Sequence, residues 1–378
     1  MAVSAGVIVA NIYYNQPILK EIANSIGVPD EQIGSVSMLA QLGYGLGMFF
    51  LLPLGDMLPR RKLIITLCLL LCVALLVFAT SSSLLVIRIM SFLIGLFSVP
   101  AQIILPMAAT FGTQNRGKTV GKVFSGILVG ILGARVLSGL ITEWLGWRYV
   151  YGISAGLVLV MAGMLYLHLP KIPVKFKGHY GSLLKSTLNL VFEYSILRQA
   201  AILGAFTFGV FCSFWTTLTF HLGSAPLNYS TGTIGSFGLI AIGGALVAPY
   251  FGRLADGGNT YKSLLITVSM IILSILLIRV FPFSVIVLIV SVFFLDIGVQ
   301  ATQITNFTRI YSLDEKAHSR LNTIYMTAYF IGAAIGTFFG LLSWKHGQWN
   351  LSTLQMLIWS LIALAVVIIS EKTTKKKV

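Results

Sequence analysis

One acidic residue lies deep in apolar sequence. Asp296 lies about 13 residues into an apolar run over 283–308, and the other ten of the 11 Asp and Glu residues fall near the ends of such runs. Burial in hydrocarbon disfavours the charged form of a carboxyl group, so a small change of surroundings can load or release its proton. Asp296 is therefore the leading candidate for a proton-carrying group.

Amides follow Asp296 along the same run. Gln300, Gln303 and Asn306 continue from it in steps of four, three and three, which places all four residues on one face of a helix. This face predicts a polar site more than two turns long. The alternative is an internal polar network that only holds helices together.

A second polar stretch lies near the N-terminus, in the sequence Asn-Ile-Tyr-Tyr-Asn-Gln-Pro over 11–17. Asn11, Tyr14 and Asn15 are spaced to share one helix face. The alternative is the outer cap of the helix, with Tyr13 in an interfacial aromatic belt and Pro17 ending the regular span.

Two arginines also occur inside apolar runs. Arg135 lies well inside the run 119–142, where an ionised side chain is a functional-site hypothesis by default. Alternatively, it extends to the periplasmic edge beside Glu143. Arg88 lies near the outer edge of the run 84–109 and is interpreted equally as a site residue or as an anchor.

The elements that must position these residues are membrane-spanning helices. Hydrophobic residues make up 57% of the chain and charged residues 10%, with a mean hydropathy of +0.91. Runs of about 20 apolar residues recur throughout, and their continuity excludes a transmembrane barrel. The expected spans are 1–23, 31–54, 63–80, 84–109, 119–142, 148–168, 196–222, 231–252, 262–280, 283–308, 319–344 and 350–370.

The distribution of the net charge of +15 indicates topology and not nucleic-acid binding. With cytoplasmic termini, 20 of the 26 Lys and Arg residues lie on the cytoplasmic side of a cell-membrane protein. These are Arg60, Arg61, Lys62, Arg116, Lys118, Lys122, Lys171, Lys175, Lys177, Lys185, Arg198, Arg253, Lys262, Arg309, Lys316, Arg320, Lys372, Lys375, Lys376 and Lys377.

The sequence repeats itself at an interval of about 200 residues. Ile33–Ala40 reappears as Ile234–Ala241, and Leu52–Asp56 corresponds to Gly252–Asp256, so the spacings are 201 and 200. The repeat predicts two six-helix bundles, residues 1–168 and 196–378, joined by a cytoplasmic linker over 169–195. Two such bundles can rock against each other around a central site.

With this repeat, the chain resembles the major facilitator superfamily over essentially its whole length. In the family's loop motif, Gly-x-x-x-Asp-basic-x-Gly-basic-basic, Asp56, Arg60 and Arg61 match, whereas Leu52, Met57 and Pro59 replace other positions. Asp256 matches in the second half. The resemblance implies a cytoplasmic latch; the alternative is a short charged turn.

The fifth helix is similar to that of the family's antiporters, which carry Gly-x-x-x-Gly-Pro-x-x-Gly-Gly. Here Gly130, Gly133, Ser138 and Gly139 keep small residues at the glycine positions, but Arg135 replaces the proline. Asp296 to Gln300 also resembles the Asp-x-Gly-Val-Gln of a bacterial subgroup, and Arg88 resembles the helix-4 arginine tied to proton transfer.

In this fold helices 1, 4, 7 and 10 line a central cavity, so the resemblance implies which side chains contact substrate. The proton-coupling candidates are Asp296, Arg135 and Arg88. The substrate-binding candidates on these helices are Asn11, Tyr14, Asn15, Gln102, Trp215, Gln300 and Gln303, and the amide and tyrosine content of helices 2 and 11 adds Gln41, Tyr325 and Tyr329.

The resulting hypothesis is a secondary active transporter that exchanges protons for a small amphipathic drug-like molecule or metabolite, acting as a monomer in the lipid bilayer. Proton-coupled uptake of a sugar or other polar nutrient is the runner-up, followed by a lipid flippase. No phosphate-binding loop, catalytic constellation, metal-ligand cluster or channel filter is visible in the sequence, so we expect no catalytic residues, metal or cofactor beyond the proton gradient.

Overall fold

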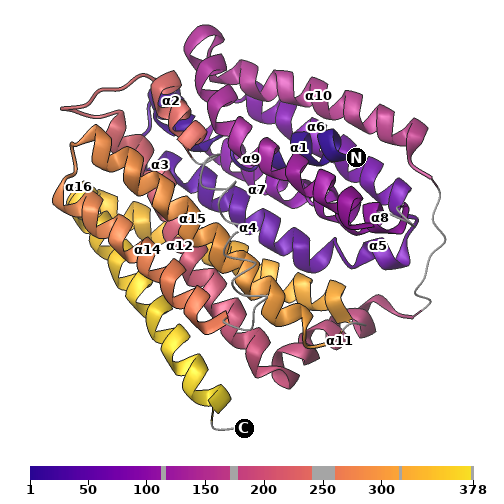
Figure 1. The fold of residues 1–378 in the computed structure, drawn as a ribbon. Coiled ribbons are helices and arrows are strands. Elements are labelled where there is room, and N and C mark those ends of the chain that lie inside the picture. Colours follow the sequence, from indigo (N-terminus) through magenta and orange to yellow (C-terminus); the bar gives the residue numbers. More distant parts are fainter. Residues whose placement is uncertain (112–115, 171–177, 241–259, 315–316, 376–378) are drawn as a thin grey trace. The chain divides into compact units, whose positions relative to one another are not determined.

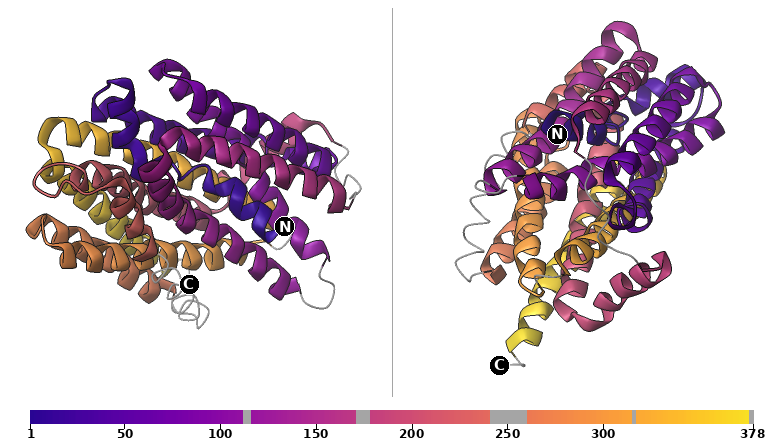
Figure 2. Two further views of the ribbon diagram at one scale, coloured as in Figure 1. Left: turned by 90° about the horizontal axis from the view of Figure 1, so that it is seen from above. Right: turned by 90° about the vertical axis from the view of Figure 1, so that its right-hand side faces the viewer.

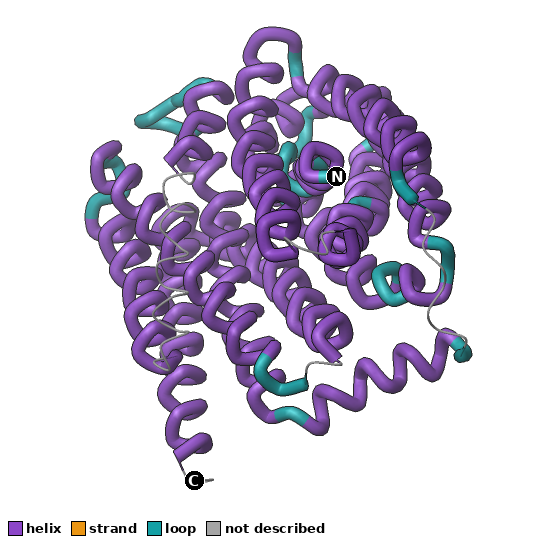
Figure 3. Tube along the Cα trace, turned by 45° about the vertical axis from the view of Figure 1, so that its right-hand side comes forward, coloured by secondary structure: helices purple, strands orange, loops and turns teal. Residues whose placement is uncertain are grey.

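The computed structural model describes residues 1–378 apart from 112–115, 171–177, 241–259, 315–316 and 376–378. In this described part the chain forms helices and loops and no strand (Figure 3). Nine of the helices found there are long and apolar enough to cross a membrane. The expected all-α membrane fold is confirmed.

Three features account for the difference between these nine helices and the twelve expected spans. The element α16 (His318–Lys375) contains two of the expected spans. They meet at Gly347 and Gln348, where the backbone leaves the helical conformation. Of the span expected over 231–252, the described part is the short apolar helix Thr231–Ile240. The first span is not one continuous helix.

The first span is broken at the polar stretch. It consists of α1 (Ala2–Ala10), the 3-10 helix η1 (Gln16–Ile18) and α2 (Leu19–Ile26). In the break, Ile12 N–H donates to Val9 O and Tyr13 N–H to Ala10 O, the tighter bonding of a 3-10 turn. Pro17, which has no N–H to donate, lies in η1. Because 3-10 turns repeat every three residues, Asn11 and Tyr14 still share one face, although the segment is not a regular α-helix.

The described chain divides into two compact units, which we describe separately. Unit 1 comprises Met1–Leu184 and Tyr229–Gly238. After the first span it contains α3 (Asp30–Ile33), α4 (Ser35–Phe50), α5 (Leu54–Met57), α6 (Arg60–Thr80), α7 (Leu84–Phe97), α8 (Pro100–Phe111), α9 (Arg116–Leu145) and α10 (Trp147–His168). Within it α4 packs on α7, α6 on α10 and α1 on α9 (Figure 1).

Glycines set the closest helix contacts of unit 1. A Cβ atom at Gly95 of α7 would collide with the backbone of α4 at Ala40, and one at Gly130 of α9 with the backbone of α1 at Gly6. Such contact without side chains between the helices is common in membranes, where small residues let backbones pack directly. The approach of α1 to α9 also brings the broken first span next to Arg135.

Unit 2 comprises Lys185–Asn228 and Leu239–Val378. The chain enters it within α11 (Tyr180–Glu193), inside the expected linker 169–195; the expected bundle boundaries stay a prediction. Its described helices are α12 (Ser195–Leu222), α14 (Thr260–Val280), α15 (Val285–Tyr311) and α16. The principal contacts join α12 to α16 and α14 to α15 (Figure 1; Figure 2).

The contact between α12 and α16 is a glycine seam. Cβ atoms at Gly332, Gly336 and Gly340 of α16 would collide with Ala205, Gly209 and Ser213 of α12, respectively. The spacing of four residues between Gly332, Gly336 and Gly340 is typical of a packing face between membrane helices, and these contacts show that they form one.

Candidate functional site

Arg135 is buried in the middle of unit 1. It lies in α9, ten residues from either end of the apolar segment Ser125–Leu145, and its side chain is 1% exposed. Its Nε donates to Gln16 Oε1 at 2.9 Å, and its guanidinium lies 5.5 Å from the centroid of the Tyr13 ring. Glu143, by contrast, is exposed. The side chain therefore stays inside the unit and does not extend to the edge beside Glu143.

The break in the first span positions the partners of Arg135. Gln16 begins η1 and Tyr13 lies in the preceding turn, so the non-α conformation presents both to α9. A guanidinium at this depth keeps its charge, and hydrogen bonding and a ring face reduce the cost of its burial. Two glycines of the helix-5 motif precede Arg135 and differ in their surroundings. Gly130 packs on α1, whereas a Cβ atom at Gly133 would meet open space.

The predicted helix-1 contacts face α10 within the same unit. Ser154 Oγ donates to Asn11 Oδ1 at 2.7 Å and is also hydrogen-bonded to Tyr14. The Asn11 side-chain amide donates to Val7 O and Ile8 O at 2.9 and 3.1 Å, so its N–H groups bond the last carbonyl groups of α1, where the helix ends. Its carbonyl and Tyr14 make an internal polar contact with α10.

Asn15 is bonded less completely. Its Nδ2 donates to Ile12 O at 3.2 Å, and its buried Oδ1 has no hydrogen-bond partner within the described residues. A buried acceptor without a partner costs free energy, of order 1–3 kcal/mol. Among the predicted contacts of helix 1, Asn15 is the one that retains an open acceptor.

Two further predicted contacts lie at the α4 and α8 helices. Gln102 lies in the first turn of α8, after an interruption of the helix between Phe97 and Pro100, and its side chain lies near the buried Tyr44 hydroxyl of α4. Gln41 is buried one turn before Tyr44, with its Nε2 3.4 Å from Ser37 Oγ. This side of unit 1 is thus an amide and phenol network.

Arg88 has an anchoring environment. Its side chain is half-buried, its Nε donates to Ser35 Oγ at 2.7 Å, and its Nη2 donates to Gln32 O at 3.1 Å. Gln32 lies in the short helix α3, whose last carbonyl groups have no partner within the helix, and Ser35 begins α4. These bonds favour the anchor interpretation.

The loop motif forms local bonds at the opposite end of unit 1. Arg60 pairs with Asp56 at 2.7 Å and donates from Nε to Gly55 O at 2.9 Å. Arg61 bonds Tyr166 O of α10 and lies 4.6 Å from the centroid of that tyrosine ring. A partly exposed pair such as Arg60 and Asp56 contributes ~0–1 kcal/mol to stability. Asp256, the fourth predicted latch residue, lies outside the described residues.

The segment that leads to unit 2 is also tied to this end of unit 1. The Tyr180 hydroxyl, at the start of α11, donates to Phe50 O at 2.6 Å, at the end of α4. Desolvation by burial raises the pKa of the Tyr180 phenol, so the group remains a neutral donor at physiological pH.

Asp296 is the buried carboxyl group among the residues of unit 2 that the structure describes. It lies in α15, 11 residues after Val285 and 15 before Tyr311, and its side chain is 1% exposed. Close packing holds this part of α15 against α14, because a Cβ at Gly298 would lie 2.8 Å from Thr267 O.

The polar residues beyond Asp296 divide between two helices. Thr302 donates to Thr267 Oγ1 of α14 at 2.8 Å, whereas Gln303, half-buried, lies 3.7 Å from Met326 Sδ of α16. Gln300 is also half-buried. The Asn306 side chain lies near the Tyr325 hydroxyl. The predicted stripe thus ends in a contact with the aromatic residues of α16.

The aromatic candidates form one cluster in unit 2. Tyr329 stacks on Phe208 of α12 with centroids 3.9 Å apart, and Tyr325 lies 5.8 Å from Tyr329. Trp215 lies further along α12, with its ring 6.2 Å from Phe211, which stacks on Phe208. Together these rings form a continuous aromatic surface.

Several partners were not identified from the sequence. Gln16 and Ser154 lie in segments expected to be helical, and nothing in their spacing indicates Arg135 or Asn11 as neighbours. The sequence indicates Arg309 only as a charge that sets the topology, yet the side chain donates to Gln199 Oε1 at 3.2 Å and to Ser370 Oγ at 2.9 Å. Its spacing of three from Asn306 was the available signal.

Comparisons with known proteins agree with this architecture. The family model described as Major Facilitator Superfamily matches residues 1–337. "Uncharacterized transporter YgaY" of Escherichia coli is 39% identical over 368 residues, covering 95% of this chain and 93% of the relative. A "Probable sugar efflux transporter" of Helicobacter acinonychis is 24% identical over 330 residues, covering 85% and 82%.

Solved structures share the fold at low sequence identity. A bacterial homolog of the human lysosomal transporter Spinster gives a TM-score of 0.76 at 14% identity, covering 98% of this chain and 95% of the other. The nucleoside transporter NupG gives 0.73 at 15%, covering 97% and 98%. From the family match, the apolar helices and this shared fold, the chain belongs to the Major Facilitator Superfamily and is a multi-pass membrane transporter of a small molecule.

Proposed function

We propose that this transporter exports a small amphipathic molecule, a drug-like compound or a metabolite, in exchange for protons. The observation that supports the proposal is Asp296, a carboxyl group that is 1% exposed in the middle of an apolar helix of 27 residues. A carboxylate at this depth is costly unless it is protonated or compensated. Alternating access would expose it to one side of the membrane and then to the other.

In the proposed cycle, Asp296 takes up a proton from outside as substrate is released there. The loaded carrier then changes its access, and the proton is lost on the inside, where substrate binds. Arg135 supplies the second buried charge, and its bond to Gln16 keeps the guanidinium in place through the cycle. The anchoring bonds of Arg88 leave it out of this cycle.

Each unit taken by itself offers groups that suit a substrate. In unit 1, Asn15 and Gln102 offer hydrogen bonds, and in unit 2, Gln303 offers one and the aromatic residues around Tyr329 offer apolar area. Such a combination suits an amphipathic molecule, because binding pockets pair a mainly apolar lining with a few placed polar groups.

The test uses purified protein in proteoliposomes that carry a pH-sensitive dye. Substrate added outside should drive protons outward from wild-type vesicles, and Asp296→Asn should abolish this while ligand binding persists. Asp30→Asn makes the same chemical change at the half-exposed start of α3 and should retain transport. Proton movement by Asp296→Asn at the wild-type rate would refute the carrier role.

A second candidate, proton-coupled uptake of a sugar or other polar nutrient, is favoured by the amides of α15 and by the sugar efflux relative. The same vesicles separate the two. In exchange, inward substrate drives protons out, whereas in uptake both move in together. A panel of a lipophilic cation, a nucleoside and a sugar assigns the substrate class.

A further inference from the structure

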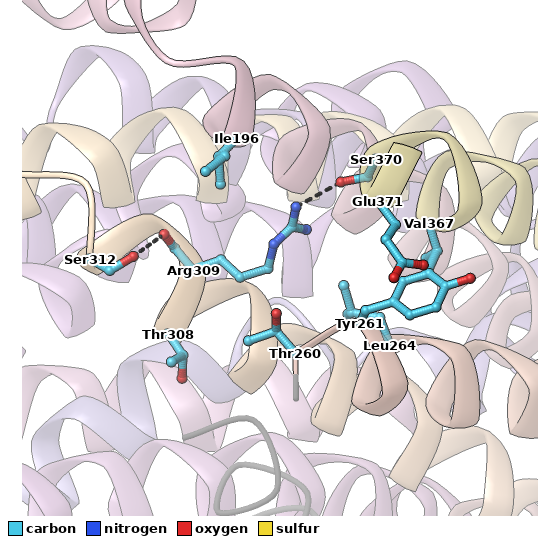
Figure 4. A pocket seen from close by; sticks show the side chains of 10 residues that line it. All are labelled: Ile196, Thr260, Tyr261, Leu264, Thr308, Arg309, Ser312, Val367, Ser370 and Glu371. Atoms are coloured by element: carbon cyan, nitrogen blue, oxygen red, sulfur yellow. Dashed lines mark hydrogen bonds between the residues drawn. The ribbon is translucent and has the colours of Figure 1, made fainter. Parts of the chain in front are cut away.

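Unit 2 has a cavity at the end where α12 and α14 begin and where α15 and α16 end. Its volume is about 300 Å³. Figure 4 shows the Arg309 side chain in the middle of this cavity, between Ile196 of α12, Thr260 of α14 and Ser370 of α16. None of the predicted transport residues lines it, so it is distinct from the proposed substrate contacts.

Arg309 gives the cavity a cation with donors to spare. Three of the five guanidinium N–H groups are used, by Ser370, Gln199 and Asn306, whose acceptor atoms lie at 2.9, 3.2 and 3.4 Å. Two donors have no partner among the described residues. The bonds to neutral groups fix the guanidinium in position without neutralising it, which suits recognition of a phosphate oxygen.

The other residues that line the cavity would not suit a simple anion such as phosphate. Glu371 lines the same cavity and would repel an isolated phosphate, but it would attract a cationic group attached to that phosphate. Leu264 and Val367 line it too and give it an apolar side. A matching ligand is therefore zwitterionic at one end and apolar at the other.

We propose that this cavity binds the head group of a phospholipid that carries a primary ammonium, a phosphoethanolamine group. The phosphate accepts from Arg309, the ammonium donates to Glu371, and the glycerol end lies along Leu264 and Val367. The cavity lies at the ends of membrane-spanning helices, which is the depth of lipid head groups. A primary ammonium is preferred to a quaternary one because it can donate hydrogen bonds to the carboxylate.

The test is lipid retention by the detergent-purified full chain, followed by native mass spectrometry after addition of dioleoylphosphatidylethanolamine or dioleoylphosphatidylcholine. The wild type should retain the ethanolamine lipid about tenfold better, the value expected for a charge-assisted hydrogen bond. Glu371→Gln should remove this preference, and Arg309→Gln should weaken retention of both lipids. This readout needs no transport, so it can fail or succeed independently of the proton-coupling proposal.

Arg198→Gln is the matched control, since Arg198 is exposed in the first turn of α12 and does not line the cavity. It should leave retention unchanged. Equal retention of both lipids by the wild type, or an unchanged preference in Glu371→Gln, would overturn the assignment. The lipid preference of Glu371→Gln tests the proposal even if Arg309→Gln does not fold. Displacement of the lipid by equimolar soluble phosphoethanolamine would show a site for a free metabolite and would overturn the lipid assignment.

Discussion

At the scale of single residues, Arg135 in unit 1 and Asp296 in unit 2 are the two buried side chains among the Asp, Glu, Lys and Arg residues that the structure describes. Their rarity made them predictable, because each charge inside an apolar run demands a reason. Their partners were not predictable in the same way. Gln16 lies 119 positions from Arg135, and only the packing of α1 on α9 brings the two together.

The bond between Gln16 and Arg135 leads to the first prediction. Gln16→Leu removes the acceptor and leaves a buried charged donor, which should destabilise the protein by about 1–3 kcal/mol. Thermal unfolding in detergent should show a melting temperature several degrees below that of the wild type. Gln32→Leu, the same substitution at an exposed position, should change it little. Equal melting temperatures for both variants would mean that the bond contributes nothing to stability.

At the scale of elements, the glycine seam between α12 and α16 holds unit 2 together. It leaves no space for a side chain, so its geometry depends on three positions in steps of four. The steps of four were visible in the sequence, and so was the conclusion that they form a packing face. The identity of the partner helix was not, because any helix with small residues could have filled that role.

The second prediction concerns this seam. Gly336→Val places two methyl groups where the backbone of Gly209 lies, so α12 and α16 must separate. Overpacking of this kind typically costs about 1–3 kcal/mol. We expect a lower melting temperature and a larger fraction of aggregated protein in size-exclusion chromatography.

The matched control is Gly163→Val in α10, where a Cβ atom meets open space. It makes the same change in a helix interior and tests for the lower helix propensity of valine. If Gly163→Val destabilises as strongly as Gly336→Val, the loss reflects propensity and the seam has no special role.

The break in the first span shows where element prediction fails. Hydropathy indicates a span from 1 to 23, since the bilayer selects apolar length, but it carries little information on local backbone geometry. In the alternative interpretation Pro17 ends the regular helix, yet α1 already ends at Ala10, and the chain continues in 3-10 turns. The Asn11 side chain, which bonds Val7 O and Ile8 O, stabilises this earlier end.

At the scale of the whole molecule, the spans were predictable because each must satisfy the same bilayer thickness. Most expected bounds agree with the helices to within a few residues, as for Arg60–Thr80 and Trp147–His168. The candidate site was predictable only as a set of residue types. Which of them bond each other depends on interhelical packing between distant segments.

The orientation of the molecule leads to the third prediction. The distribution of Lys and Arg predicts cytoplasmic termini, so the loop between α6 and α7 should face outward and the start of α16 inward. Ser82→Cys should react in intact cells with a membrane-impermeant maleimide, and Ser319→Cys only after permeabilisation. Both serines are exposed, and the natural Cys68 and Cys212 are buried. The reverse labelling pattern would invert the predicted topology.

The glycine seam has a mechanical consequence. At the seam the backbones of α12 and the adjoining part of α16 are in direct contact, with no side chains between them. A displacement of one helix should therefore displace the other by the same amount. Phe208 and Tyr329 are stacked 3.9 Å apart across these two helices, so we expect the two rings to move together. A movement of α12 in unit 2 should therefore carry the whole aromatic cluster with it.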